Sequence, residues 1–428
     1  MKIIFFRRFF KKIDIGGKMQ YNIDMETINT AIIGGGASGL FLATALREAG
    51  KIVLLERGDR VGKKLSSTGN GQGNITNTSA SKTSYFTLQN AGAGIAEKII
   101  STADETSLDA YFKDLGVLLS ADERGRVYPA SRQASALTDA LRFSVIQKGV
   151  DVRLSSRVTA LQQAKNGFVL TVENEESSYQ IHAETVVLCA GGKAAKNFGT
   201  DGSAYALAQG LGHSITPLYP SLVQLKTDVT HTKTLKGIRV NDGGLTAYLP
   251  NGETLSLRGD VIFTDYGVSG DAVFRISAYV ADKIEAGVSL AIDFLPQITE
   301  TEIGQALQRK KSAFPNLPDG ELLFGIVNNQ VGRAVMKRAN GDISTAAKLV
   351  KNFPLTVTGS LGFDYAQVTK GGIPLAEVTE NLESRFAKGL YFAGEILDVD
   401  GPCGGFNLQW AYSSAMHVAA ALNARGTV

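Results

Sequence analysis

The alternation of apolar and polar positions predicts a β-α-β unit near the start of the chain. Residues 28–33 (INTAII) form a short, β-rich apolar run, and a glycine-rich turn follows at once at residues 34–39. The segment LFLATALREA then has the pattern of a buried helix that Gly50 closes, and KIVLLE predicts a second strand ending at Glu56. This order of strand, glycine turn, helix and strand is typical of a nucleotide-binding fold.

Later apolar runs predict further strands and helices. DVRLSSRVTALQQ, GFVLTVEN and SYQIHAE predict three strands ahead of a separate buried strand in TVVLCAGG at residues 185–192. Short strands with Gly and Pro punctuation follow, and then a helical stretch from ITETEIGQALQRKKSAF to ISTAAKLVKNF. The C-terminal part of the chain again has the order of strand, glycine-rich loop and helix seen near the start. These are the strand GLYFAGE at residues 389–395, the loop at 401–405 and a helix from about Phe406 to Asn423.

The fold class that these patterns predict is α/β, with a Rossmann-like domain split in sequence. A chain of 428 residues is too long for one ordinary hydrophobic core, so several units are expected. The predicted Rossmann-like domain is formed by residues 26–215 and 356–428, and a flexible basic extension (1–25) precedes it. A β-barrel-like domain (216–296) and a small helical subdomain (297–355) are inserted into it.

The glycine turn carries the clearest chemical prediction. A lone G-x-G-x-x-G is a weak signal, but here it follows a strand, opens a helix and is answered by Glu56 at the end of the second strand. The first glycine allows the tight turn, the second lets the backbone approach a pyrophosphate, and the third permits close helix packing, while Glu56 accepts hydrogen bonds from ribose hydroxyls. The residues expected at the phosphates are Gly34, Gly36, Ala37, Ser38 and Gly39.

The C-terminal half favours FAD over NAD. The apolar strand of residues 390–394 stops at the carboxylate of Glu395, which suits the hydroxyls of a ribityl chain, and NAD has no such chain. A helix that begins at residues 404–407 would point its N–H groups at the pyrimidine edge of a flavin, where negative charge develops on reduction.

The residues also carry a family resemblance over most of the chain. Its motifs are GKKLSSTGNGQGNITN (62–77), GRVYPASRQAS (125–135), VVLCAGGKAAKNFGTDG (186–202), FTDYGVSG (263–270) and GLYFAGEILDVDGPCGGFNLQWAYSS (389–414). In these the chain resembles the BaiN-like (YhiN, aminoacetone oxidase-like) NAD(P)/FAD-dependent oxidoreductases. The resemblance implies a flavoprotein with FAD across a two-part α/β domain.

The resemblance also implies further cofactor contacts. It places Glu395 near the ribityl chain, residues 404–407 near the flavin ring, Val158 near the adenine, and Ala190 and Gly191 on a loop that returns to the cofactor. The remaining contacts expected on this basis are Arg57, Lys64, Thr68, Asn74, Gly394, Gly404, Gly405, Phe406 and Asn407.

Two departures from the family pattern weaken any transfer of chemistry. Gln72-Gly73 stand where family members usually carry Arg-Cys, and Asp265 stands where His is frequent. No catalytic residue is therefore assigned, and no metal site is indicated. Because flavin chemistry needs little from the protein beyond orientation and electrostatics, an acid–base pair need not be visible in the sequence.

Several other residues are candidates with an ordinary structural alternative. Cys403 stands beside the expected flavin ring without a C-x-x-C partner, and Cys189 fits a core position. The remaining candidates are Arg126, Tyr128, Lys193, His213, His231, Trp410 and His417.

Composition and charge limit the compartment and the partners. The formal charge of +3 arises in residues 1–18, which carry six Lys/Arg and one Asp, so the other residues have a net charge of −2. This balance argues against a nucleic-acid partner, and the two cysteines and the absence of a long apolar run favour a cytoplasmic protein without stable membrane insertion. The expected ligands are FAD and a small-molecule substrate.

Three functional hypotheses stay open at this point. In the first, NAD(P)H supplies electrons to the flavin, which reduces a small organic acceptor such as a C=C bond beside a carbonyl. The sequence contains no second Rossmann fingerprint after a strand, since GAGIAE (92–97) lacks that context. The alternatives are an amine or aminoketone oxidase that forms hydrogen peroxide, and an RNA-modifying or non-catalytic FAD-binding protein.

Overall fold

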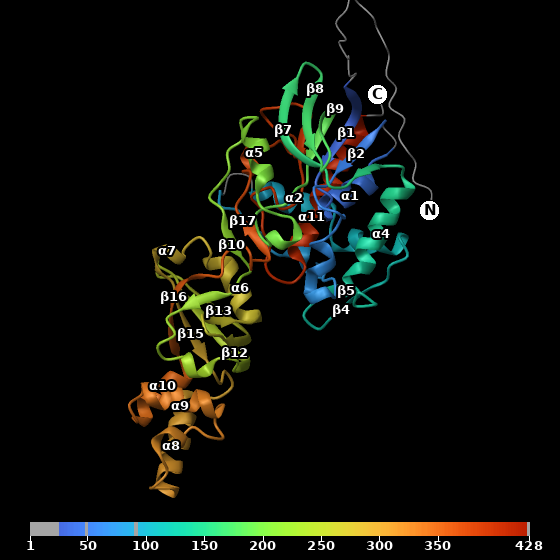
Figure 1. Ribbon diagram of the computed structural model, residues 1–428. Helices are drawn as coiled ribbons and strands as arrows, with labels where there is room; N and C mark the ends of the chain where they lie inside the picture. The colour runs from blue at the N-terminus through green and yellow to red at the C-terminus, as the bar shows by residue number, and fades with distance from the viewer. Residues whose placement is uncertain (1–24, 48–49, 90–92, 426–428) are drawn as a thin grey trace, which may run out of the picture.

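The computed structural model describes residues 25–47, 50–89 and 93–425. The predicted basic extension (1–25) therefore lies outside the described residues apart from Met25. Figure 1 shows an elongated molecule with a large sheet at one end, a barrel in the middle and the helices α8 to α10 at the other end.

A seven-stranded sheet forms the core of the first body, within the described part of the chain. β6 (Asp151–Arg153), β2 (Ile52–Leu55), β1 (Glu26–Ile33) and β9 (Ser178–Leu188) run parallel to one another in that order. β8 (Gly167–Glu173) and β7 (Arg157–Ala164) extend the sheet as antiparallel strands. β18 (Leu390–Phe392) pairs in parallel with β9, so the end of the chain joins the sheet formed by its beginning.

Two strand predictions were wrong in detail. SYQIHAE and the strand after it form one strand, β9, because residues 178–183 pair with β8 and residues 186–188 pair with β18 along the same strand. The run DVRLSSRVTALQQ is divided into β6 and β7, because Ser155 adopts a left-handed conformation between them.

A closed barrel forms the second body. Its strands are adjacent in the order β11 (Leu225–Thr227), β14 (Gly267–Ser269), β13 (Thr254–Phe263), β12 (Arg239–Tyr248), β15 (Ser289–Asp293) and β16 (Phe353–Ser360). β16 follows the helical segment in sequence and closes the barrel against β11. The fold class is confirmed: a Rossmann-like α/β body with an inserted barrel and an associated group of helices.

The helices cover both bodies. Their bounds are α1 Ala37–Ala45, α2 Ala93–Thr102, α3 Glu105–Asp114, α4 Ala134–Gln147, α5 Ser203–Gln209, α6 Asp271–Val280, α7 Ile284–Gly287, α8 Glu300–Ala313, α9 Asn329–Arg338, α10 Ile343–Lys351 and α11 Phe406–Arg425. α8 begins with a capping box between Thr299 and Glu302, and α9 and α10 are capped by Asn328 and Asp342. Among the described residues, no helix is both long and apolar enough to cross a bilayer.

Buried apolar side chains form two large cores. One contains the sheet with α1 and α11, and the other contains the barrel together with Ile303, Val335 and Val350 of α8 to α10. The helical segment therefore shares its core with the barrel. The domain boundaries, including the division at 296/297, stay a prediction.

Two short strands connect the bodies. β10 (Tyr219–Ser221) leads into the barrel and β17 (Val368–Lys370) leads out of it, and the two pair antiparallel. The three-stranded sheet β3 (Thr76–Asn77), β5 (Arg126–Pro129) and β4 (Leu119–Ala121) lies below the main sheet in Figure 1.

Candidate functional site

A large cavity lies where the two bodies meet the glycine turn. Its volume is about 990 Å³, at the upper end of the range of roughly 300–1,000 Å³ found for ligand pockets. Its walls include residues 34–38 after β1, residues 403–405 before α11, and side chains of the barrel and α6. The two stretches that the sequence predicts to share a cofactor therefore line one cavity.

The glycine turn has the geometry that a phosphate loop needs. Gly34 has a φ of +106°, and a Cβ there would lie 2.7 Å from the backbone of Ala190. Gly36 lies at the N-cap of α1, where a Cβ would have no atom within 4 Å, so the turn presents open space to the cavity. At Gly39 a Cβ would lie 1.9 Å from the carbonyl oxygen of Gly34, so only a glycine at this position lets α1 pack this close to β1.

Glu56 is held in place at the end of β2. Its carboxylate accepts hydrogen bonds from the backbone N–H of Gly35 (2.7 Å) and of Gly58 (2.6 Å). Its neighbour Arg57 is paired with Asp201, whose Oδ2 lies 2.7 Å from Nη1. Burial alone would raise the pKa of Asp201, but hydrogen bonds from Arg57 and Ser203 outweigh it and lower that pKa to about 2.

An ion pair joins the two halves of the site. Lys64 Nζ lies 2.8 Å from Glu395 Oε2, and both side chains are largely buried. Glu395 Oε1 also accepts a hydrogen bond from the backbone N–H of Thr369 (2.8 Å). The carboxylate at the end of β18 is thus oriented by a residue 331 positions earlier.

The loop before α11 contains two left-handed glycines and is hydrogen-bonded to the helix. Gly404 (φ +122°) and Gly405 (φ +103°) are left-handed, and a Cβ at Gly405 would lie 2.2 Å from the carbonyl oxygen of Thr76. The side chain of Asn407 accepts from Gly401 N (2.9 Å) and donates to Gly401 O (2.8 Å), which closes the loop onto the helix. Because the first N–H groups of an α-helix have no intrahelical partner, the start of α11 presents donors at this end of the cavity.

Most of the predicted contact residues line the cavity. Those that do are Gly34, Gly36, Ala37, Ser38, Glu56, Arg57, Lys64, Thr68, Asn74, Val158, Ala190, Gly191, Glu395, Gly404, Gly405 and Asn407. Gly39, Gly394 and Phe406 lie behind the wall: Gly394 O accepts from Trp410 Nε1 (3.1 Å), and Phe406 packs edge-on against Tyr85. The cofactor contacts themselves stay a prediction.

The sequence did not predict the cavity wall that the barrel and α6 contribute. Arg239, Asp260 and Ile262 come from β12 and β13, and Asp271 and Phe274 come from α6. No motif marks them, since they reach the cavity only through the position of the barrel. The family-pattern blocks did contain Arg126 and Tyr128, which line the cavity from β5.

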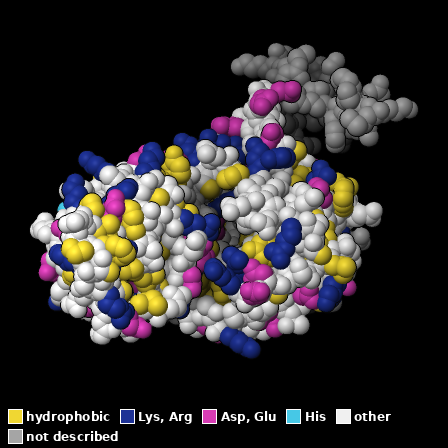
Figure 2. Space-filling view, turned by 90° about the horizontal axis from the view of Figure 1, so that it is seen from below, with side chains coloured by type: hydrophobic (Ala, Val, Ile, Leu, Met, Phe, Trp, Pro, Cys, Tyr) yellow, Lys and Arg dark blue, Asp and Glu magenta, His cyan; other side chains and the backbone are white. Residues whose placement is uncertain are grey.

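Two ion pairs lie in the cavity wall where the bodies meet. Arg124 Nη1 lies 3.1 Å from Asp271 Oδ2 and connects the β4–β5 turn to α6, while Arg126 pairs with Asp122 at 2.7 Å. Figure 2 shows a hollow in the middle of one face with Lys and Arg side chains at its rim. The lining cations include Arg57, Arg60, Lys63, Lys64, Arg124, Arg126, Arg132, Arg157 and Arg239.

The other candidate residues divide between the cavity and the scaffold. Cys403 lines the cavity, and burial raises the pKa of its thiol to about 11, so it is a thiol and not a thiolate near neutral pH. Cys189 is buried. His213 contacts Glu377 and Ser384, away from the cavity, and Lys193 lies over the ring of Phe363. Asp265 is exposed and pairs with Lys236.

The residues present fit FAD. The open space at Gly36 suits a pyrophosphate, Glu56 and Glu395 supply carboxylates at two strand ends, and α11 supplies N–H groups beyond them. A bound FAD would supply hydride transfer, and the protein would supply binding, orientation and electrostatics. Together the parallel sheet, the glycine turn and the two-part site define an FAD-dependent oxidoreductase with a Rossmann domain.

Comparison with known families agrees with this class. The chain belongs to the family described as "HI0933-like protein Rossmann domain", whose model matches residues 28–421. The resemblance found in the sequence motifs is thereby confirmed.

Curated relatives of two kinds match about nine-tenths of the chain. The 3-dehydro-bile acid delta(4,6)-reductase of Clostridium scindens is 33% identical over 401 residues, which cover 90% of this chain and 96% of the relative. The ribosomal RNA dihydrouridine synthase of Haemophilus influenzae is 28% identical over 398 residues, with 90% and 96% covered.

Solved structures share the fold at low identity. The 3-ketosteroid delta1-dehydrogenase of Sterolibacterium denitrificans has a TM-score of 0.53 and 13% identity, and the match covers 94% of this chain and all of the other. A flavocytochrome c3 fumarate reductase has a TM-score of 0.50 and 15% identity, with 94% and 79% covered. At this identity the likeness concerns the fold alone.

Proposed function

We propose that the protein reduces an activated C=C bond beside a carbonyl in a small organic molecule, with electrons that NAD(P)H delivers to the flavin. The observation that carries the proposal is the match to a 3-dehydro-bile acid delta(4,6)-reductase over nine-tenths of the chain. Beyond the residues expected at FAD, the cavity wall continues onto Leu222, Ile262 and Phe274, and an acceptor would bind against these apolar side chains.

The proposed roles divide between the two bodies. Residues 34–39, Glu56, Glu395 and the start of α11 would bind FAD, and the barrel with α6 would cover the acceptor and exclude water. Arg126 is the proposed contact for the acceptor's carbonyl, because its Cγ lies 3.6 Å from the position of a Cβ on Gly404 and Asp122 orients its guanidinium. NAD(P)H would approach the flavin transiently.

The test is anaerobic mixing of the FAD-loaded protein with NADH or NADPH. Loss of the flavin's visible absorbance is expected with at least one of them, and a conjugated cyclic enone should then restore it. No bleaching by either nucleotide would remove the proposed donor. Reduction of the flavin by an amine instead of a nicotinamide, followed by rapid reoxidation by oxygen with one hydrogen peroxide formed per reduced flavin, would favour the oxidase hypothesis.

A second candidate function is reduction of a uracil ring in RNA. The names of the relatives from Haemophilus influenzae and Escherichia coli favour it, and the ring's C5=C6 bond is likewise conjugated with a carbonyl. α8 to α10 carry many cations that an RNA backbone would attract, including Arg309, Lys310, Lys311, Arg333, Lys337 and Lys348.

One pair of assays separates the two candidates. A small-enone reductase should reoxidise its reduced flavin with a cyclic enone and show no salt-sensitive retention on RNA. An RNA reductase should bind ribosomal RNA with an affinity that falls as salt rises, and should leave dihydrouridine in it.

A further inference from the structure

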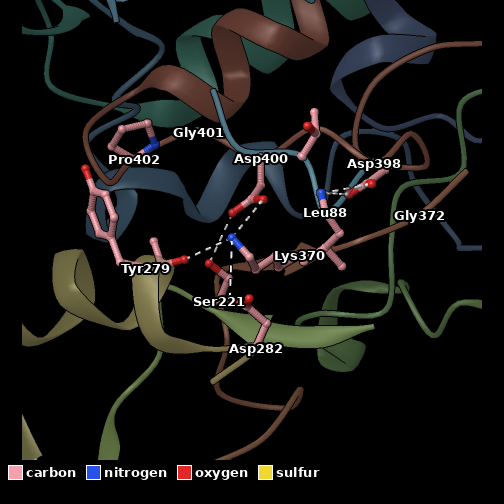
Figure 3. Close-up of polar contacts among 12 residues, drawn as sticks. Leu88, Ser221, Tyr279, Asp282, Lys370, Gly372, Asp398, Asp400, Gly401 and Pro402 are labelled. Atoms are coloured by element: carbon pink, nitrogen blue, oxygen red, sulfur yellow. Dashed lines mark hydrogen bonds and ion pairs between the residues drawn. The ribbon is translucent and has the colours of Figure 1, made fainter. Parts of the chain in front are cut away.

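A buried ionic cluster lies where the two bodies meet, behind the loop that leads into α11. Lys370 Nζ lies 4.0 Å from Asp400 Oδ1 and 4.0 Å from Asp282 Oδ1, and it donates to the carbonyl oxygen of Ala278 at 3.2 Å. Lys370 and Asp400 are 5% and 0% exposed. Figure 3 shows the ammonium of Lys370 between the two carboxylates.

The cluster combines parts of both bodies and of both connections between them. Lys370 lies on β17, Ser221 on β10, Asp282 just after α6, and Asp400 between β18 and α11. Ser221 Oγ donates to Asp400 Oδ2 at 3.4 Å. Within the described residues, Asp400 Oδ1 and Asp282 Oδ1 have no hydrogen-bond partner.

Asp400 is covalently joined to residues 401–405, which we call the flavin loop. It precedes Gly401, whose N–H donates to the side chain of Asn407 in the first turn of α11. The backbone of Asp400 is fixed by two hydrogen bonds with Phe86 (2.7 and 3.0 Å). Cys403 of the loop packs into the apolar cluster that includes Phe86 and Tyr279.

Burial and the neighbouring carboxylates favour the protonated form of Asp400. Burial raises its pKa to about 7, Lys370 opposes that rise, and Asp398 and Asp282 add to it. Asp398 is itself held by backbone N–H groups of Leu88 and Gln89, and Asp282 pairs with Lys283. The ring of Phe86 packs edge-on against Tyr279, and the ammonium of Lys370 lies 4.7 Å from the centre of the Phe86 ring.

We propose that Lys370 and Asp400 are positioning residues for the flavin loop, and that Asp400 takes up one proton when the flavin beyond the loop gains negative charge. The electrons reach the flavin from its reductant, and the proton comes from solvent, so that the only new bond in the cluster is O–H on Asp400. Protonation removes the negative charge of Asp400, so the positive charge of Lys370 is no longer offset by it and stabilises the negative charge on the reduced flavin. The proposal depends on FAD binding and not on the identity of donor or acceptor.

The test is the pH dependence of the flavin midpoint potential in the FAD-loaded full chain, with a chemical reductant and neither NAD(P)H nor an organic acceptor. The wild type and Asp400→Asn should agree near pH 6. Above about pH 7, where Asp400 ionises before reduction, the wild-type potential should fall more steeply than that of the variant. Parallel profiles over the whole range would overturn the proposal.

Further variants keep the test decisive if Asp400→Asn fails to fold. Ser221→Ala removes the hydroxyl that stabilises the carboxylate, so the steeper part of the profile should move to higher pH, and an unchanged profile would contradict the proposal. Lys370→Arg should keep the wild-type profile, and Lys370→Met should lower the potential. Asp265→Asn, which changes an exposed pair with Lys236, is the control and should change nothing.

Since the assay contains no nicotinamide, a negative result here would leave the proposed reductase activity standing. Conversely, failure of NADH and NADPH to bleach the flavin would not affect these potentials.

Discussion

At the residue scale, the glycines of the first turn serve two separate purposes. Gly39 is required by packing, because a side chain there would collide with the backbone of Gly34. Gly36 faces open space, so it is required only if a ligand occupies that space. The sequence predicted both glycines through one motif, but only the coordinates separate the two reasons.

This pair gives a matched test of the phosphate site. Gly36→Ala should change the free energy of unfolding of the apoprotein by about 1 kcal/mol or less, and lower FAD affinity at least about tenfold, or about 1.4 kcal/mol. Gly39→Ala should destabilise the apoprotein by about 3 kcal/mol or more, because the collision is with backbone. Chemical unfolding and fluorescence titration with FAD measure both quantities. Normal FAD affinity in Gly36→Ala would argue against a phosphate at this turn.

The buried Asp400 gives a prediction for stability against pH. Its pKa of about 7 lies above the value of about 3.9 expected in the unfolded chain, so the folded state binds more protons between these values. Protonation of Asp400 therefore contributes fully to the free energy of unfolding below about pH 4. This contribution is lost as the pH rises towards 7, and the total loss is at most about 4 kcal/mol. The free energy of unfolding of Asp400→Asn should not show this fall, because the amide does not ionise. Equal pH profiles of wild type and variant in urea unfolding would contradict the assignment.

At the scale of single elements, the sequence predicted local patterns better than long-range pairing. The first strand, the glycine turn and α11 have strong local signals and were predicted close to their observed bounds. The helix after the turn was predicted over residues 40–49 with Gly50 as its end, and this was wrong: α1 spans Ala37–Ala45, because the backbone is already extended at Leu46. β9 was divided because polar residues near Glu184 resemble a turn, although the strand continues and changes partner from β8 to β18. The Lys370 cluster has no local signature, since its members are brought together by β10, β17 and α6.

The loop before α11 provides the prediction at this scale. Asn407→Ala removes the hydrogen bonds with Gly401 in both directions, which should cost about 1–3 kcal/mol of unfolding free energy. Asn407→Asp keeps the acceptor for Gly401 N and should lose less. Both are compared with the wild type by urea unfolding of the apoprotein. If the Ala variant unfolds at the wild-type urea concentration, the side chain does not hold the loop.

At the scale of the whole molecule, both bodies line the cavity, and the proposed function gives the cofactor to one body and the acceptor to the other. The predicted cofactor residues lie on the Rossmann-like body, and Arg239, Ile262 and Phe274 face them from the barrel side. The sequence predicted the cofactor side because phosphate and ribose binding use recognisable turns. It did not predict the proposed acceptor side, because a barrel wall needs only shape and apolar surface, which many side chains provide.

This division predicts a selective effect of Phe274→Ala. Loss of the ring should lower kcat/KM for the acceptor about tenfold or more, since a lost apolar contact weakens binding of the acceptor. FAD affinity and the rate of flavin reduction by NAD(P)H should stay near wild type. Phe314→Ala, an exposed position at the distal helices, is the control and should leave all three unchanged. Equal loss in both half-reactions would place Phe274 at the cofactor instead.

We expect residues 34–39 and 394–407 to hold one FAD between them. The most direct measurement is the absorbance spectrum and released cofactor of the purified full-length protein, with Gly36→Ala prepared alongside. The expectation is a yellow protein that releases one FAD per chain, and a folded but cofactor-poor Gly36→Ala variant. A colourless wild-type protein that is folded and takes up no added FAD would contradict it.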